Sequence, residues 1–236
     1  MSDIQVEAAG GGTFEAYLAL PSGAGPAPGL LLLPPIYGVE PLIRTLADGY
    51  AARGYVVLAP NQFWRDDEPQ VMERTDAGRA AALARAKRVD VESVVADLGA
   101  AAAALRAMPA CNGKIAVLGF CFGGRYAYIA AARLPVDAVA AFHAAQIGLS
   151  LAPAPRVPIS LHFGEDDPIA PMSEVEAIEA AVRHAQRDNG ITDADVVVYP
   201  GATHNFAVPG VPGYDPAVAA LSEQRVFTLF DRLKAG

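Results

Sequence analysis

Continuous apolar runs, each ended by a glycine, a proline or a polar turn, recur along this chain. Such runs are typical of strands buried on both faces of a sheet, because neither face then needs polar side chains. They lie at residues 29–33, 55–59, 115–118, 136–142 and 157–163, with an alternating strand at 13–20 and a valine-rich strand at 195–199. Between them we expect helices at about residues 40–53, 77–88, 91–108, 122–133, 173–188 and 215–234.

The regular alternation of strands and helices predicts an α/β protein. Strands joined by helices form mainly parallel sheets that are covered on both faces. We therefore expect a mainly parallel, twisted sheet of about seven or eight strands with helices on both faces. The sequence shows no internal repeat and no inter-domain linker, so residues 1–236 are expected to form a single domain.

Composition narrows the classes of function. The net charge is −8, which argues against a nucleic-acid-binding groove. Two cysteines, Cys111 and Cys121, are too few for a disulfide scaffold, and no Cys/His pair has the spacing of a zinc site, so we expect no metal. The sequence also lacks a signal peptide and a charge-free apolar stretch long enough to span a membrane, which predicts a cytoplasmic protein with free thiols.

The segment GFCFGG at residues 119–124 follows an apolar run directly and leads into helical sequence. A strand, a sharp glycine-flanked turn and a helix form the nucleophile elbow of α/β-hydrolases, here with Cys121 where most members carry serine. Glycines are needed because side chains beside the turn would collide with the strand and the helix. The helix N-terminus favours a thiolate, and the N–H of Phe122 can face a developing oxyanion. A buried structural cysteine in a glycine-rich turn is the alternative.

Two later strands lead into polar loops that complete a catalytic pattern. The strand at 157–163 is followed by three acids that end in Asp167, and the strand at 195–199 by a loop that contains His204. An α/β-hydrolase carries its nucleophile, acid and histidine in this chain order, each beyond the carboxyl end of a strand. We therefore predict a triad in which Cys121 attacks, Asp167 orients the imidazole and His204 transfers protons. The alternatives are an ordinary loop histidine and a turn or capping aspartate.

The loop after the strand at 29–33 is expected to supply a second oxyanion donor. It reads PPIYG over residues 34–38. Because proline has no N–H, Ile36 is the first residue of this loop that can donate. An ordinary proline-glycine loop is the alternative.

At these residues the chain resembles the dienelactone hydrolase (carboxymethylenebutenolidase) family of α/β-hydrolases. The resemblance covers about residues 14–233 and is carried by GFCFGG at 119–124, NGK at 112–114, ATHNF at 202–206 and YGV at 37–39. It implies an α/β-hydrolase fold, a triad of Cys121, Asp167 and His204, and oxyanion amides from Ile36 and Phe122. It also implies opening of a small anionic lactone from aromatic degradation, without a metal or a cofactor.

The chain departs from the family next to the expected oxyanion residue. Well-studied members carry a glutamate there, which keeps the resting thiol protonated until substrate displaces it. This chain has Pro35, which cannot accept a proton, and the nearest acid, Glu40, is expected on the following helix. Without that carboxylate, Cys121 is expected to rest as a reactive, easily oxidised thiolate paired with histidine.

The positions that bind the substrate carboxylate in the family also differ. Of two family arginines, the first matches Arg79, which suits a carboxylate through paired hydrogen bonds, and the second is replaced by Val208. We expect Arg79, Tyr37 and Trp64 to contact substrate, although Arg79 reads equally well as a solvated helix arginine and Trp64 as a core or surface aromatic. Leu83 and Ala86 stand where the family has a tyrosine and a tryptophan.

The leading hypothesis is a cysteine-dependent hydrolase of a small ester or lactone that acts through a thioester. One alternative is a carboxylesterase or thioesterase for a less anionic substrate. A second is a non-hydrolytic ligand-binding or thiol-sensing relative, and a third is an acyl transferase, for which no acceptor site is evident. The expected partner is the small-molecule substrate, with no nucleic acid and no membrane, and the protein is expected to be a monomer or a weak dimer.

Overall fold

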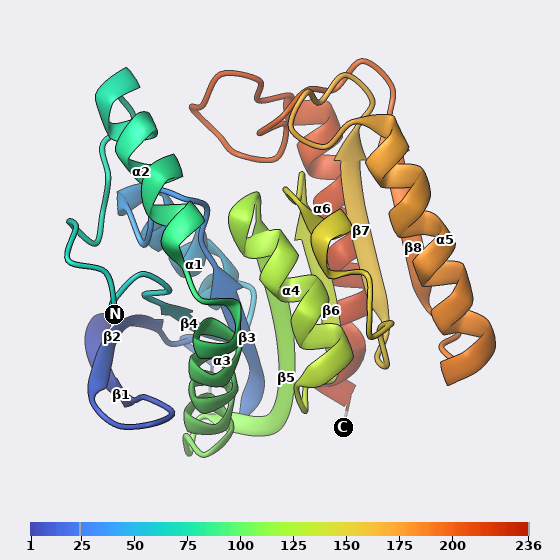
Figure 1. Ribbon diagram of the computed structural model, residues 1–236. Helices are drawn as coiled ribbons and strands as arrows, with labels where there is room; N and C mark the ends of the chain where they lie inside the picture. Colours follow the sequence, from blue (N-terminus) through green and yellow to red (C-terminus); the bar gives the residue numbers. More distant parts are fainter. Residues whose placement is uncertain (24, 236) are drawn as a thin grey trace. The chain divides into compact units, whose positions relative to one another are not determined.

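The computed structural model describes residues 1–23 and 25–235, and within them eight strands follow the order β1-β2-β4-β3-β5-β6-β7-β8 in one sheet (Figure 1). Six of the strands lie where the sequence places them. The strands are β1 (Ser2–Glu7), β2 (Thr13–Ala19), β3 (Ala27–Leu33), β4 (Val56–Pro60), β5 (Cys111–Phe120), β6 (Ala138–Phe142), β7 (Ile159–Gly164) and β8 (Ala194–Tyr199). The mainly parallel α/β sheet predicted from the alternation of elements is confirmed.

The helices follow the predicted order along the chain. They are α1 (Pro41–Ala52), α2 (Asp76–Arg88), α3 (Val91–Arg106), α4 (Phe122–Arg133), α5 (Met172–Asn189) and α6 (Pro216–Phe230), with short 3₁₀ helices η1 (Ile147–Ser150) and η2 (Asp231–Ala235). Among the described residues, none of these helices is both long and apolar enough to cross a membrane.

The chain divides into two compact units, Met1–Ala116 and Val117–Gly236, and each is described by itself. We call them the first unit and the second unit. The expectation of a single domain stays a prediction.

In the first unit, β3 and β4 are parallel, while β1 and β2 are antiparallel to their neighbours. Helix α1 packs on β2 and β4, and α3 packs on the opposite face against β1, β3 and β4 (Figure 1). Leu30, Leu31, Leu32 and Leu33 of β3 have no exposed surface, and each contributes about 1.5–3 kcal/mol through burial.

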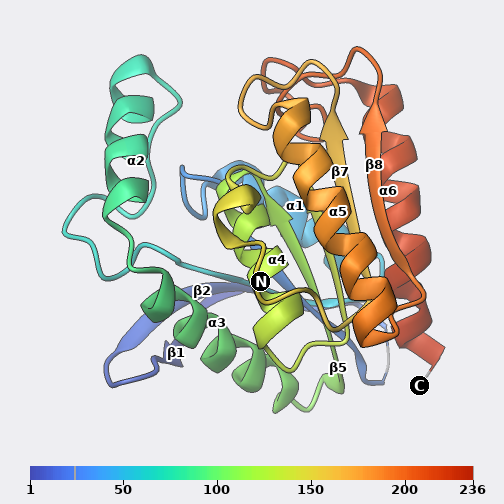
Figure 2. The same ribbon diagram turned by 45° about the vertical axis from the view of Figure 1, so that its right-hand side comes forward.

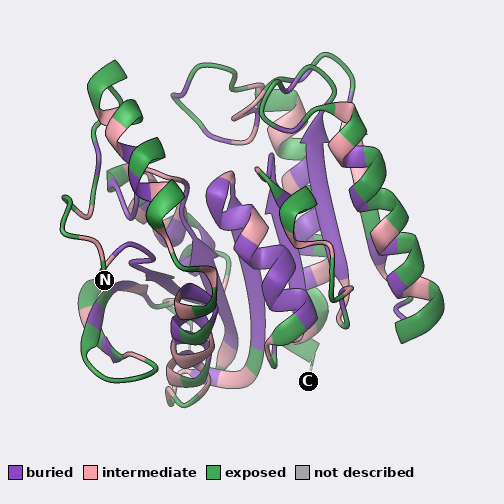
Figure 3. Ribbon diagram, in the orientation of Figure 1, coloured by how far each residue is buried: buried purple, intermediate pink, exposed green. Residues whose placement is uncertain are grey.

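Helix α2 differs from the other helices of the first unit. Its buried residues are Ala82 and Arg85, and most of its surface is exposed (Figure 3). It packs less extensively on the strands of this unit than α1 and α3 do. Thr75 caps its first turn by accepting a hydrogen bond from the N–H of Gly78, and basic residues in its last turn complement the helix dipole.

In the second unit, β6, β7 and β8 are parallel neighbours. Helices α4 and α5 cover one face, against β6 and β8, and α6 covers the other face, against β6 and β7 (Figures 1 and 2). The carboxyl ends of these strands therefore open at one edge of the sheet, which is where parallel α/β proteins place their sites.

Two strands differ from the sequence-based expectation. β1 was not predicted, because it is an edge strand in which only Val6 is buried and polar residues alternate with few apolar ones. β5 is longer than the predicted strand at 115–118, because it begins at Cys111 and includes the less buried residues 112–114, which do not belong to the apolar run.

Candidate active site

Cys121 occupies a sharp turn between β5 and α4. Its backbone has φ 50° and ψ −114°, a left-handed conformation that few residues other than glycine adopt. The turn is held from three sides: the N–H of Cys121 donates to the carbonyl of Phe142 (3.2 Å), and its own carbonyl accepts from Gly124 and Ala145 (3.0 Å each). The half-buried side chain stands at the N-terminus of α4, as the predicted elbow requires.

The glycines around the turn are explained by close backbone approach. A Cβ on Gly119 would lie 2.3 Å from the carbonyl oxygen of Gly123, and a Cβ on Gly124 would lie 2.4 Å from the Cβ of Ala144. These contacts are shorter than van der Waals distance, so a larger residue at either position displaces backbone.

Asp167 and His204 meet at the carboxyl ends of β7 and β8. Oδ2 of Asp167 lies 2.7 Å from Nδ1 of His204, and Oδ1 accepts hydrogen bonds from the N–H groups of Ile169 (2.8 Å) and Ala170 (3.4 Å). The Asp167 carboxylate is therefore fixed at both oxygens and has no exposed surface. Its neighbours Glu165 and Asp166 are exposed, which identifies Asp167 as the acid that contacts the imidazole.

His204 is also hydrogen-bonded to Cys121, so the second unit brings the three predicted triad residues together. Burial alone lowers the pKa of His204, but hydrogen bonds to Asp167 and Cys121, together with their charges, outweigh burial and raise the pKa to about 9. At neutral pH the imidazole is consequently protonated and faces the sulfur as a cation.

Aromatic rings surround this charged group. The fully buried His143, directly after β6, contacts the His204 ring edge-on at 4.7 Å between centroids. Phe206 packs edge-on against His143 at 5.7 Å. His162 lies deeper in β7, between Ser160 Oγ and the Tyr199 hydroxyl at 2.9 Å each, and burial lowers its pKa to about 3. His162 is therefore a neutral core residue.

The expected second oxyanion residue, Ile36, lies in the first unit, in a loop of residues 34–40 that we call the β3 loop. Hydrogen bonds hold the carbonyls of Pro35, Ile36 and Tyr37, but within residues 1–23 and 25–235 the N–H of Ile36 meets no acceptor. Glu40 caps α1 rather than lying within it, and Arg74 binds its carboxylate through Nη2 (2.6 Å) and Nε (3.0 and 3.1 Å). Glu40 is thus engaged in a bidentate ion pair, and it is not available to replace the family glutamate at Pro35.

The predicted substrate-contacting residues, also in the first unit, have different surroundings. Arg79 is exposed on α2, and Tyr37 is half-buried beneath the Arg74 guanidinium, 4.4 Å from its ring centre. Trp64 donates from Nε1 to Asp97 (2.8 Å) and stacks on Phe14 at 5.9 Å, so its ring is packed into the first unit. In the second unit, Val208, at the position of the second family arginine, is buried.

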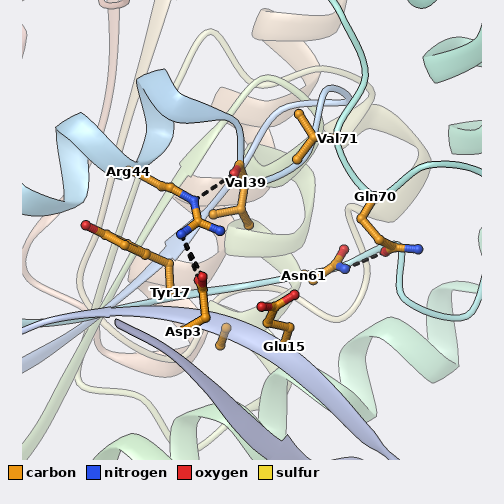
Figure 4. Close-up of a pocket in the computed structure, with 9 residues that line it drawn as sticks. Asp3, Glu15, Tyr17, Val39, Arg44, Asn61, Gln70 and Val71 are labelled. Carbon is orange, nitrogen blue, oxygen red and sulfur yellow. Dashed lines mark hydrogen bonds and ion pairs between the residues drawn. The ribbon is translucent and has the colours of Figure 1, made fainter. Parts of the chain in front are cut away.

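A small cavity of about 40 Å³ lies between the start of the chain, β2 and the β3 loop (Figure 4). Arg44 crosses it and donates to Asp3 and to the carbonyl of Val39. On the opposite side, the amide groups of Asn61 and Gln70 are hydrogen-bonded to each other. This volume is far below the roughly 300–1,000 Å³ of typical small-molecule sites.

The described residues hold no group of three or more His, Cys, Asp or Glu side chains arranged to bind a metal ion. The expected absence of a metal and of a cofactor stays a prediction.

Comparison with known proteins agrees with the fold and with the family resemblance. The sequence model of the dienelactone hydrolase family matches residues 14–234. A putative carboxymethylenebutenolidase of Azospirillum brasilense is 31% identical and covers 98% of both chains. Carboxymethylenebutenolidase 1 of Cupriavidus pinatubonensis is 30% identical, over 98% of this chain and 97% of its own. The crystal structure of a putative dienelactone hydrolase from Klebsiella pneumoniae superposes with a TM-score of 0.81 at 25% identity, over 98% of this chain and 100% of its own.

Proposed function

This chain belongs to the dienelactone hydrolase family and is a hydrolase of esters or lactones, and we propose that it acts through a thioester on Cys121. The observation that carries the proposal is the contact of His204 with both Asp167 and Cys121. A nucleophile, a base and a group that orients the base, all within hydrogen-bonding reach, are the arrangement that covalent acyl transfer requires.

The proposed first half-reaction forms the thioester. The Cys121 thiolate attacks the acyl carbon, a sulfur–carbon bond forms, and the carbonyl electron pair moves to oxygen. When the intermediate collapses, the carbon–oxygen bond breaks, and the leaving oxygen takes the proton of the His204 imidazolium. Asp167 holds the imidazole in place throughout, because its carboxylate accepts the hydrogen bond from Nδ1.

The proposed second half-reaction hydrolyses the thioester. His204, now neutral, removes a proton from water, and the hydroxide attacks the thioester carbon. The sulfur–carbon bond breaks, the thiolate of Cys121 and the imidazolium of His204 are restored, and the carboxylic acid leaves. The net reaction consumes one water and needs no redox partner.

Backbone N–H groups are proposed to stabilise both oxyanions. The N–H of Phe122 belongs to the first turn of α4, where helical N–H groups have no acceptor within the helix. The N–H of Ile36 is the second proposed donor, supported by its lack of an acceptor in the described chain.

The proposed substrate is a small ester or lactone that is less anionic than a dienelactone. Arg79 is the remaining residue of the family pair that binds a carboxylate, since Val208 is apolar and buried. Leu83, at the position of a family tyrosine, is exposed. A true dienelactone hydrolase that relies on Arg79 alone is the second candidate.

The deciding experiment compares kcat/KM for cis-dienelactone and for a neutral short-chain aryl ester. Cys121→Ala is expected to lower both values by at least about 10³-fold. Cys111→Ala is the matched control, because Cys111 is the other free cysteine and is buried at the start of β5. Mass spectrometry of acid-quenched enzyme is expected to show an acyl adduct in the wild type and none in Cys121→Ala.

Turnover that survives Cys121→Ala would refute the thioester mechanism. A higher kcat/KM for the neutral ester supports the less anionic substrate. A preference for the lactone by orders of magnitude supports the pathway enzyme, with Arg79 as its anion contact.

A further inference from the structure

Arg85 is a cation without exposed surface, on a helix that is otherwise mostly solvated. No carboxylate in the described chain forms an ion pair with it. Removing a charge from water costs several kcal/mol, and buried arginines are normally paired with acids. The packing of α2 alone therefore does not explain why the guanidinium of Arg85 is buried.

The contacts of Arg85 are directed at two backbone carbonyls. Nη2 donates to the carbonyl of Ile36 at 2.8 Å, and Nη1 donates to the carbonyl of Pro69. The guanidinium lies 3.9 Å above the ring of Phe63, while Nε meets no partner in the described chain. Burial lowers the pKa of Arg85, which is the expected effect of holding this charge away from water.

The carbonyls on either side of Ile36 are held by backbone groups. The N–H of Gly38 donates to Pro35, and the N–H of Met72 donates to Tyr37, each at 3.0 Å. With Arg85 on Ile36, three successive carbonyl oxygens are therefore fixed. The φ of +82° at Gly38, and the 2.2 Å between its hypothetical Cβ and the carbonyl oxygen of Gln70, show how closely the loop lies on the segment 69–72.

We propose that Arg85 is a positioning residue that holds the carbonyl of Ile36 and thereby fixes the conformation of the β3 loop, so that the N–H of Ile36 keeps one direction before substrate binds. The inference rests on the proposed function, which makes Ile36 an oxyanion donor. A donor is effective only when it is aimed before the charge develops. Arg85, on α2, holds the β3 loop in one conformation. Pro35, which replaces the family glutamate, belongs to the same loop.

An arginine suits this role better than another donor. Its planar fork reaches two acceptors at once, so the Ile36 and Pro69 carbonyls are joined through one rigid group. A lysine has one flexible ammonium, and a glutamine has one amide, so neither keeps both bonds in the same geometry.

The test uses Arg85→Gln and Arg85→Lys in the full chain, with Arg88→Gln as the matched control. Arg88 lies on the same helix and pairs with Asp66 at 2.9 Å, but its side chain is half exposed. Arg85→Gln is expected to lower kcat for ester hydrolysis by about 10- to 100-fold and to change KM by less than about threefold. The reason is that a less ordered Ile36 N–H stabilises the transition state less, while substrate binding in the ground state is little affected. Arg85→Lys is expected to fall between Arg85→Gln and the wild type, and Arg88→Gln to match the wild type.

Alkylation of Cys121 by iodoacetamide separates this role from a general loss of structure. The thiolate displaces iodide from a saturated carbon, no oxyanion forms, and the rate is therefore expected to stay within about twofold of wild type in every Arg85 variant. A parallel fall in alkylation and hydrolysis would mean that Arg85 acts on the thiolate or the whole fold, and would overturn the proposal. Unchanged kcat would overturn it as well.

Hydrogen exchange tests the loop independently of activity. The amides of Gly38 and Met72 are expected to lose protection in Arg85→Gln and to keep it in Arg88→Gln, because the first change removes the bond to Ile36. Unchanged protection would overturn the proposal. If Cys121→Ala left turnover intact, the thioester function would fail, and the exchange result would still decide whether Arg85 orders the loop.

Discussion

Replacing Asp167 with asparagine separates the charge of this residue from its shape. Asparagine can still accept from the N–H groups of Ile169 and Ala170, but it no longer places a carboxylate 2.7 Å from Nδ1 of His204. In the wild type, the pKa of His204 is raised from 6.5 to about 9, although burial opposes the rise. Each pKa unit corresponds to about 1.36 kcal/mol, so the folded state favours the protonated form of His204 by about 3 kcal/mol more than the unfolded state does.

Asp167→Asn is therefore expected to lower the pKa of His204 by more than about one unit, since a carboxylate partner favours the protonated imidazole. NMR titration of the imidazole resonances measures this directly, because the chain has only four histidines to assign. Asp166→Asn is the control, as it removes the same charge from an exposed neighbour. The reasoning is refuted if Asp167→Asn leaves the pKa within about 0.3 units of wild type, or if Asp166→Asn lowers it equally.

The same shift predicts how stability depends on pH. A histidine whose folded pKa is raised contributes stability that is complete below about pH 6.5 and is lost as the pH rises through about 9. The advantage of wild type over His204→Gln in urea unfolding should therefore shrink by about 3 kcal/mol between pH 6 and pH 10. If the free energy of unfolding changes with pH equally in wild type and in His204→Gln, the raised pKa does not belong to His204.

Two further predictions concern packing around the elbow. Gly124→Ala is expected to destabilise the protein by about 1–3 kcal/mol in urea unfolding, because the new methyl group would lie 2.4 Å from the Cβ of Ala144. The control is Gly49→Ala on α1, whose methyl group meets nothing within 4 Å and should stabilise the protein by about 0.5–1 kcal/mol. Equal changes in the free energy of unfolding for the two variants would show that close packing does not explain the glycine at position 124. His143→Ala is expected to lower the free energy of unfolding by about 3 kcal/mol and to lower kcat, since it leaves a cavity beside the His204 ring. His143→Phe should retain more of the stability and more of the kcat. Identical kcat for wild type and His143→Ala would exclude a role of this ring in orienting His204.

The buried strands and the contact of Asp167 with His204 could be predicted because their signals are local. Runs such as residues 29–33 are apolar without interruption, and Cys121, Asp167 and His204 each come within a few residues of the end of a strand. Chain order and strand ends were sufficient to choose Asp167 over its two acidic neighbours.

The features that escaped prediction depend on distant partners. Nothing in the polar, alanine-rich sequence of α2 distinguishes the buried Arg85 from the exposed Arg79, because the carbonyls that bind Arg85 lie 16 and 49 residues away. Glu40 likewise reads as a helix acid until Arg74, 34 residues later, is seen to bind it. Long-range pairing of this kind leaves no periodic signal in a single sequence.

The proposed reactive groups and most of the proposed recognition groups occupy separate stretches of chain. Cys121, Asp167 and His204 come from the second unit, whereas Tyr37, Trp64 and Arg79 come from the first. Substitutions among residues 34–88 that leave Ile36 and Arg85 unchanged can therefore change the choice of substrate while the proton balance of the thiol–imidazole pair stays constant. In an evolving or engineered lineage, new specificities would then appear without repeated loss and recovery of the nucleophile, and a library restricted to that stretch is the economical way to search for them.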